Sequence, residues 1–208
     1  MPAGPAMSLP PSPPPRNDAA CEGGESIAAR LARLDAALAA YGERLGDPLA
    51  AEYRAFLRGG IERFTRQHLA GHFTGSAFVV SADGERCLLL HHAKLDRWLQ
   101  PGGHADGEPD LAAVALREAE EETGLAGLVV EGGVLDLDRH AIPARGAEPE
   151  HWHWDVRYLV RCTAGETPRI NAESRAFAWR RIDALAVDAG VEPSIRRMAA
   201  RWLESRGK

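Results

Sequence analysis

Apolar side chains change their spacing near residue 70, and this change divides the chain into a helical part and a strand-rich part. Before that point they recur every three or four residues, as in Ile27, Leu31, Leu34 and Leu38, which is typical of an amphipathic helix. The pattern predicts helices over three ranges, residues 25–42, 47–58 and 61–69.

After residue 70 the apolar residues form short runs separated by turn residues, and such runs predict β-strands. They occupy residues 73–81, 86–91, 95–99, 127–130, 134–142 and 177–179. The Asp83-Gly84 pair between the first two runs predicts a β-hairpin. An amphipathic helix is expected over Pro193–Ser205.

The segment His151–Cys162 alternates between two kinds of side chain. Aromatic and aliphatic residues occupy the even positions, while the odd positions begin with His151, His153, Asp155 and Arg157. A period of two residues predicts a half-buried strand. Taken together, the elements predict an α+β sandwich, with helices around a mixed sheet and a helical N-terminal extension.

The composition suggests three consecutive regions. Residues 1–24 are dominated by Pro, Gly, Ala and Ser, which bury too little apolar surface to offset the entropy of ordering, so a disordered tail is expected. Its run Pro10–Pro15 has the alternative reading of a polyproline ligand. Residues 25–70 form the helical extension, and residues 71–208 the sandwich domain. The extension could cover the sheet, shape a substrate cleft or build a homodimer interface, and the sequence leaves these roles open.

Charge and cysteine content narrow the function classes. The net charge of −5 argues against binding to a nucleic-acid backbone. The three cysteines, Cys21, Cys87 and Cys162, are scattered, which favours a reduced, cytoplasmic compartment. No window approaches 18 consecutive apolar residues, so no membrane span or membrane partner is expected.

The strongest candidate for chemistry is a group of glutamates in a helix expected between Pro109 and Gly124. Glu118, Glu121 and Glu122 are spaced i, i+3, i+4, so they project from one helix face. Like charges at this spacing destabilise a helix, as do anions near its C-terminal end. Three oxygen ligands without a cysteine suit a hard divalent cation, Mg2+ or Mn2+.

The surrounding segment, WLQPGGHADGEPDLAAVALREAEEETGL, resembles the Nudix box, G-x5-E-x7-R-E-U-x-E-E-x-G-U, in which U is aliphatic. The residues that match it are Gly103, Arg117, Glu118, Glu121, Glu122, Gly124 and Leu125. The isolated glutamate of the box would fall at Pro109, and Glu108 stands just before that position. No role is therefore assigned to Glu108.

The resemblance implies the Nudix α/β/α sandwich and the metal-dependent hydrolysis of a nucleoside diphosphate linked to another moiety, which would be the small-molecule partner. Glu118, Glu121 and Glu122 would be the ligands of Mg2+ or Mn2+, and one of the latter two could also serve as the base. Arg117 would hold Glu121 in position.

The resemblance also suggests residues beyond the metal ligands. Gly102 and Gly103 would let the backbone approach the substrate. A distant general base is expected at Glu173, with Glu148 and Asp155 as rivals. The identity of the substrate stays open.

Four histidines provide a second candidate group. His72, His104, His151 and His153 could line the substrate cleft, or together form a Zn2+ or Mn2+ site. The second reading would resemble isopentenyl-diphosphate isomerases, which share the Nudix fold and use a His/Glu metal site. Their catalytic cysteine is absent from the turn here, where Gly102 and Gly103 stand. A non-catalytic nucleotide sensor is a third alternative, but such domains usually lose box glutamates.

Overall fold

The computed structural model describes residues 25–146, 148–169 and 174–207. The tail expected over residues 1–24 lies outside these ranges. Within them, no helix is long and apolar enough to cross a membrane. The helices are α1 (Ile27–Leu45), α2 (Leu49–Leu57), a short 3-10 helix (Ile61–Phe64), α3 (Leu111–Thr123), α4 (Ile182–Val187) and α5 (Pro193–Arg206).

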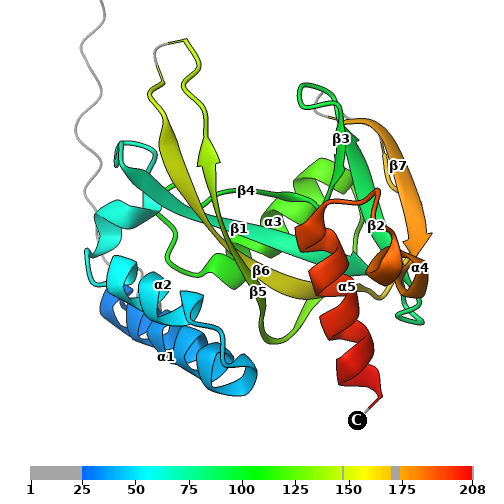
Figure 1. The fold of residues 1–208 in the computed structure, drawn as a ribbon, viewed down its shortest axis with the longest axis horizontal. Coiled ribbons are helices and arrows are strands. Elements are labelled where there is room, and N and C mark those ends of the chain that lie inside the picture. The colour runs from blue at the N-terminus through cyan, green and yellow to red at the C-terminus, as the bar shows by residue number, and fades with distance from the viewer. Residues whose placement is uncertain (1–24, 147, 170–173, 208) are drawn as a thin grey trace, which may run out of the picture.

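The described strands form one mixed sheet, as the sequence predicted (Figure 1). Its order is β3-β2-β1-β6-β5, with β4 also paired to β1 and β7 to β2. The β1–β6 pair is parallel, and the others, including the predicted β1–β2 hairpin, are antiparallel. The strands are β1 (Gly71–Val80), β2 (Arg86–His92), β3 (Arg97–Leu99), β4 (Gly102–His104), β5 (Leu128–Ile142), β6 (His151–Cys162) and β7 (Ser174–Arg181).

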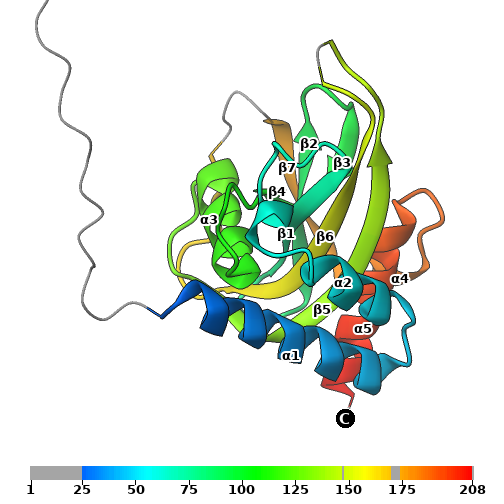
Figure 2. The ribbon, with the colours of Figure 1, turned by 90° about the vertical axis from the view of Figure 1, so that its left-hand side faces the viewer.

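Helices cover both faces of this sheet, with α3 on one side and α4 and α5 on the other (Figure 2). Neighbouring residues of a strand point to opposite faces, so β1 contributes to two cores. Phe73 and Val79 pack in the core shared with α1, α2 and α3, whereas Phe78 and Val80 pack beneath α4 and α5. The structure is thus an α+β sandwich.

The N-terminal helices belong to the same core as α3. Leu38, Tyr53 and Phe64 are fully buried in it. The Tyr53 hydroxyl donates a hydrogen bond of 3.1 Å to the carbonyl oxygen of Asp155 on β6, and the Phe64 ring stacks on Phe73 with centroids 4.7 Å apart. Among the three roles left open by the sequence, this packing fits a helical block that covers the sheet.

Two local predictions were wrong, and one helix was not predicted. The helix expected over residues 61–69 is only a 3-10 turn, because the backbone becomes extended at Thr65. The strands expected over residues 127–130 and 134–142 are one strand, β5, whose register with β6 shifts between Glu131 and Asp136. Helix α4 was not predicted, since six residues give too short a pattern to detect.

The prediction that β6 is half-buried was also wrong. Its polar side chains His151, Asp155 and Arg157 are only 2–4% exposed, whereas Trp152 is 42% exposed. Strand β6 is central in the sheet, and helices cover both of its faces. Val156 and Val160 pack in the core shared with α1, α2 and α3. Arg157, on the other face, pairs with Asp136, which also binds Arg197 and Arg201 of α5.

Candidate functional site

The glutamate-bearing helix α3 is fixed at both ends and lies close to β1. The Asp110 carboxylate caps its start by accepting a hydrogen bond from the Ala113 amide at 3.1 Å. Gly124 ends it with a left-handed backbone, φ 64°, as the sequence predicted. A Cβ added at Gly75 of β1 would lie 2.8 Å from the carbonyl oxygen of Leu111. The absence of a side chain at Gly75 therefore allows the helix to approach the strand.

Strand β4 lies directly against the carboxylate of Glu118. A Cβ added at Gly103 would lie 2.4 Å from Oε2 of Glu118. Arg117 holds both partners, because its Nη2 donates to Oε1 of Glu118 at 2.8 Å and to the carbonyl oxygen of His104 at 3.0 Å. The arginine and the glycine thus fix this carboxylate against β4.

The other two glutamates differ in burial. Glu122 is 9% exposed, and its Oε2 accepts a hydrogen bond from the backbone N–H of Gly102 at 2.9 Å. The Glu121 side chain is 65% exposed, and its Oε1 lies 4.0 Å from Nε of Arg117. The sequence led us to expect that Arg117 holds Glu121, but its shorter contact is with Glu118.

The donor set of these glutamates suits a hard divalent cation, since it consists of carboxylate oxygens. The cradle that Gly103 forms around Glu118 supports this fit, because any side chain at position 103 would occupy it. The three glutamates do not converge in this way, however. Among the described residues, the ligand atoms that lie within 4.8 Å of one another belong to three histidines, His72, His104 and His153. Binding of one cation by all three glutamates would therefore require their side chains to rotate.

The predicted histidines come together on three strands. His72 of β1 pairs with His153 of β6, and His104 of β4 pairs with Thr74, two residues along β1 from His72. One ligand atom each of His72, His104 and His153 lies within 4.8 Å of the others. His151 lies beside them, with its Nε2 3.4 Å from Nε2 of His153. We call these four residues the imidazole group.

The surroundings favour neutral rings in this group. Burial, with repulsion from neighbouring imidazoles, lowers the pKa of His72 to about 4 and the pKa of His153 to about 2. Burial and the nearby charge of Arg66 also lower the pKa of His104. Neutral imidazole can accept hydrogen bonds or bind a metal ion.

The three candidates for a distant base differ in their surroundings. Glu173 lies outside the described residues. Asp155 is 2% exposed, and its carboxylate accepts hydrogen bonds from Thr74, Ser76 and Arg157 at 2.7–2.9 Å, which suits a structural role rather than proton transfer. Glu148 lies on an exposed loop, with its Oε1 3.8 Å from Nε2 of His151.

Glu108 has a structural role that the sequence did not reveal. Both of its carboxylate oxygens accept hydrogen bonds of 2.9 Å from Nη1 of Arg30 on α1, and Oε1 also accepts from the Asp110 amide at 2.8 Å. Glu108 therefore links the loop before α3 to the N-terminal helices. This contact spans 78 residues, and no local pattern could have indicated it.

A buried charge network beneath β4 was also missed. Asp136 has no exposed side-chain surface and pairs with Arg157, Arg197 and Arg201. Arg157 in turn donates to Asp155 at 2.7 Å. Ser76, which also donates to Asp155, lies so close to Gly102 that a Cβ there would be 2.2 Å from its Oγ. The network thus packs against β4 through Ser76. The period-two pattern located the polar face of β6, but it gave no sign that this face is buried.

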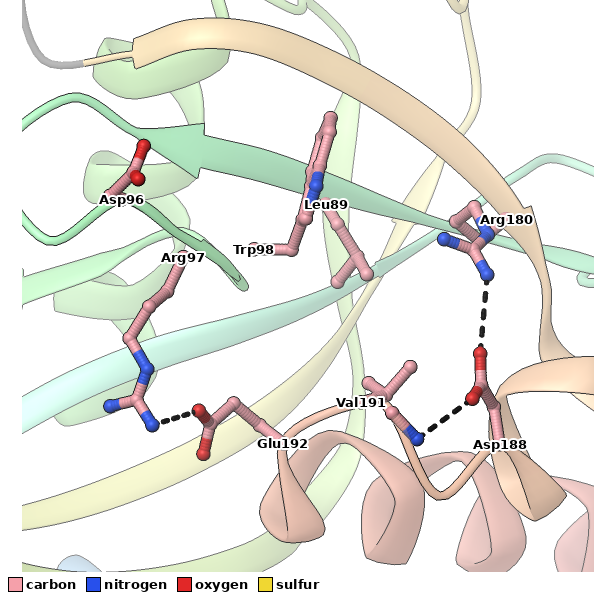
Figure 3. Close-up of a pocket in the computed structure, with 9 residues that line it drawn as sticks. Leu89, Asp96, Arg97, Trp98, Arg180, Asp188, Val191 and Glu192 are labelled. Atoms are coloured by element: carbon pink, nitrogen blue, oxygen red, sulfur yellow. Dashed lines mark hydrogen bonds and ion pairs between the residues drawn. The ribbon is translucent and has the colours of Figure 1, made fainter.

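One pocket lies between β3, β7 and the loop before α5 (Figure 3). Its lining includes Trp98 and two ion pairs, Arg97–Glu192 at 2.5 Å and Arg180–Asp188 at 3.5 Å. None of the site residues predicted from the sequence lines it. Its arginines are already paired with carboxylates, so we place no chemistry there.

Comparisons with known proteins agree with this architecture. The family model described as the NUDIX domain matches residues 72–202, which is more than half of the chain. No curated protein matches this chain in sequence. An Ap4A hydrolase from C. elegans, solved as a binary complex, is similar in structure with a TM-score of 0.52 at 16% identity, covering 65% of this chain and 97% of that one. A MutT protein from Methanosarcina mazei Go1 gives a TM-score of 0.51 at 17% identity, covering 68% and 99%. At such identities the likeness concerns the fold, and together with the family match it shows that the chain belongs to the Nudix family.

Proposed function

We propose that this protein hydrolyses a phosphoanhydride bond in a nucleoside diphosphate linked to another moiety, using Mg2+ or Mn2+. The observation that carries the proposal is the placement of the box glutamates against β4. Glu118 lies against Gly103, and Glu122 accepts a hydrogen bond from the backbone of Gly102. The two elements of the box therefore meet in space.

Glu118, Glu121 and Glu122 would hold the cation. When bound, it supplies Lewis-acid polarisation of phosphate oxygens and lowers the pKa of a bound water. Arg117 orients Glu118 through a charge-assisted hydrogen bond, and the Gly102 N–H fixes one oxygen of Glu122. Of the three glutamates, Glu121 is the most exposed. Solvent therefore reaches it most easily, and we assign it as the proton acceptor.

The residues around β4 would position the substrate. Gly102 and Gly103 present backbone without side chains, and His104 continues the strand. His151 and His153 belong to the imidazole group, which adjoins β4 through His104 on the face opposite Glu118, so they would act on the substrate through the position of β4. A side chain at Gly102 would overlap Ser76, and one at Gly103 would overlap Glu118.

An isomerase with a His/Glu metal site is the second candidate, because the imidazole group is its specific structural support. The cysteines argue against it. Cys87 and Cys162 lie on β2 and β6 and are fully buried, and burial raises the pKa of both thiols. Gly102 and Gly103 lie in strand β4 and not in the turn that the sequence led us to expect. Neither of these cysteines is near them in sequence, and Cys21 lies outside the described residues. Hydrolysis therefore remains the better supported reaction.

A substrate panel separates the candidates. We would incubate the full chain with Mg2+ or Mn2+ and with dinucleoside polyphosphates, nucleoside diphosphate sugars, deoxynucleotides and isopentenyl diphosphate. Phosphorus NMR distinguishes cleavage of an anhydride from rearrangement of the isopentenyl group. Dinucleoside polyphosphates are included because an Ap4A hydrolase shares the fold.

Metal-dependent cleavage of a nucleotide derivative is the expected outcome. Isomerisation without cleavage would contradict the proposal and favour the isomerase. Tight nucleotide binding by calorimetry, with no turnover of any compound, would favour a non-catalytic sensor instead.

A further inference from the structure

We propose that the imidazole group is a second metal centre, in which His72, His104 and His153 bind a borderline transition-metal ion such as Zn2+ and His151 is the fourth donor. Imidazole nitrogen suits Zn2+ and its neighbours in the transition series, whereas Mg2+ prefers oxygen. The two centres would therefore select different ions.

The first support is the condition of His72. This side chain is 2% exposed, and neither ring nitrogen has a hydrogen-bond partner among the described residues. The backbone of His68 lies close to the ring, but neither ring nitrogen meets it with the distance and angle of a hydrogen bond. A buried polar atom without a partner is costly and uncommon. A metal ion among the convergent nitrogens would satisfy one of the two.

The second support is the tautomer of His151. Its Nδ1 lies 2.9 Å from the carbonyl oxygen of Pro149. A carbonyl only accepts, so Nδ1 carries the hydrogen and the neutral ring presents a lone pair at Nε2. This lone pair faces Nε2 of His153. A second ring nitrogen anchored to a backbone carbonyl is the usual arrangement of metal-binding histidines.

The distance between these two nitrogens agrees with shared coordination. They are 3.4 Å apart, which is long for a hydrogen bond between nitrogens. With Zn–N bonds of about 2.0–2.1 Å, two ligands of a tetrahedral ion lie about 3.4 Å apart. The wider spacing within the group, up to 4.8 Å, would contract on binding through side-chain rotation.

The nearby charges are compatible with a bound cation. Arg66 acts on His72 and His104, but its guanidinium is paired with both carboxylate oxygens of Asp106 at 2.8 and 3.0 Å. Glu148 brings a carboxylate oxygen to 3.8 Å from Nε2 of His151.

The centre would connect three strands, because its ligands come from β1, β4 and β6. Adjacent residues of a strand point to opposite faces. On β4, Gly103 faces Glu118 of α3, while His104 faces the opposite way, toward His72. A metal ion at His104 would thus position the strand against which the glutamates lie.

The test measures Zn2+ binding directly, so its result does not depend on the proposed hydrolysis. We would treat tag-free full-length protein with a chelator, remove the chelator, and titrate with Zn2+ in competition with a chromophoric chelator. One Zn2+ per chain is expected. Because loss of an outer partner already weakens metal binding by about 10–100-fold, His104→Gln and His153→Gln should each raise the Kd by more than about 100-fold.

Two controls distinguish this centre from its surroundings. His140→Gln changes an imidazole whose ring lies 5.5 Å from that of His153 but which belongs to a different strand and bonds Asp138, and it should leave the Kd unchanged. Glu122→Gln should also bind Zn2+ as the wild type does. An equal loss in His140→Gln, or in Glu122→Gln, would overturn the assigned ligands.

X-ray absorption at the zinc edge of the wild-type protein tests the same claim without any variant. Scattering from imidazole rings at about 2.0–2.1 Å is expected. Oxygen-only coordination, or the absence of stoichiometric Zn2+ binding, would overturn the proposal even if the histidine variants failed to fold.

Discussion

Gly103 and Glu118 are in contact across the gap between β4 and α3, so that one added methyl group at Gly103 would lie 2.4 Å from Oε2 of the glutamate. No real Cβ contact is this short, and the atom in its way is the end of a flexible side chain. A substitution at Gly103 would therefore displace the carboxylate rather than the backbone. This contact connects the two halves of the box motif, which are separated by a loop in the sequence.

The first prediction follows from this contact. Gly103→Ala should lower kcat by at least about tenfold, equivalent to about 1.4 kcal/mol in the activation free energy, because it moves a proposed metal ligand. The melting temperature should change little. Gly133→Ala is the matched control, since a Cβ there meets nothing within 4 Å. Equal kcat values for Gly103→Ala and the wild type would show that the position of Glu118 does not matter.

The second prediction concerns the N-terminal helices. Phe64 is fully buried and stacks on Phe73, so Phe64→Ala should lower the free energy of unfolding by about 3–5 kcal/mol. Leu69→Ala is the control, because Leu69 is 63% exposed. It should change the free energy of unfolding by no more than about 0.5 kcal/mol. Urea unfolding measures both. Wild-type stability in Phe64→Ala would mean that the helical block is not part of the core in solution.

Truncation gives the third prediction. Deletion of residues 1–24 should leave the melting temperature and activity nearly unchanged, because a segment of this composition contributes little to a core. Deletion of residues 1–70 should prevent folding, since it removes the fully buried Leu38, Tyr53 and Phe64. A soluble, cooperatively unfolding 71–208 fragment would show instead that the helical block is a separate module.

The fourth prediction is a pH dependence at Asp138. Burial alone would raise the pKa of this carboxyl, but its hydrogen bond with His140 and the charges of Arg157 and Arg197 hold it well below its usual range. A carboxyl with a lowered pKa in the folded state stabilises the protein above its unfolded value of about 3.9, and this contribution is lost as pH falls.

Asp138→Asn tests this dependence. The difference in unfolding free energy between wild type and variant should be largest above about pH 5 and should shrink toward pH 2. Urea unfolding across this range provides the measurement. A difference that stays constant with pH would mean that the ionised form of Asp138 has no preferred partners.

Local patterns in the sequence predicted the elements whose partners are nearby in the chain. The period of α1, the Asp83-Gly84 hairpin and the glycine that ends α3 are examples, and each appears in the structure. The sheet was correctly expected to be mixed. These features depend on side-chain spacing and backbone preference, which a single sequence contains.

Most features that depend on distant partners were not predicted. The burial of Asp155 and Arg157 depends on partners from β1 and β5, and Glu108 meets an arginine 78 residues away. The gathering of four histidines depends on the parallel register of β1 and β6. The sequence suggested these histidines as a group only because two of them share one strand face.

Binding of the catalytic cation by the box glutamates can be tested through the kcat of Glu122→Gln with Mg2+, on a substrate identified by the panel. The substitution removes a charge but keeps an oxygen that can accept the hydrogen bond from Gly102. Glu120→Gln, an exposed change on the same helix, is the matched control. We predict a kcat lower by about 100-fold or more for Glu122→Gln, with an unchanged melting temperature, and wild-type turnover for Glu120→Gln. Near-wild-type turnover in Glu122→Gln at saturating Mg2+ would show that this glutamate does not hold the catalytic cation.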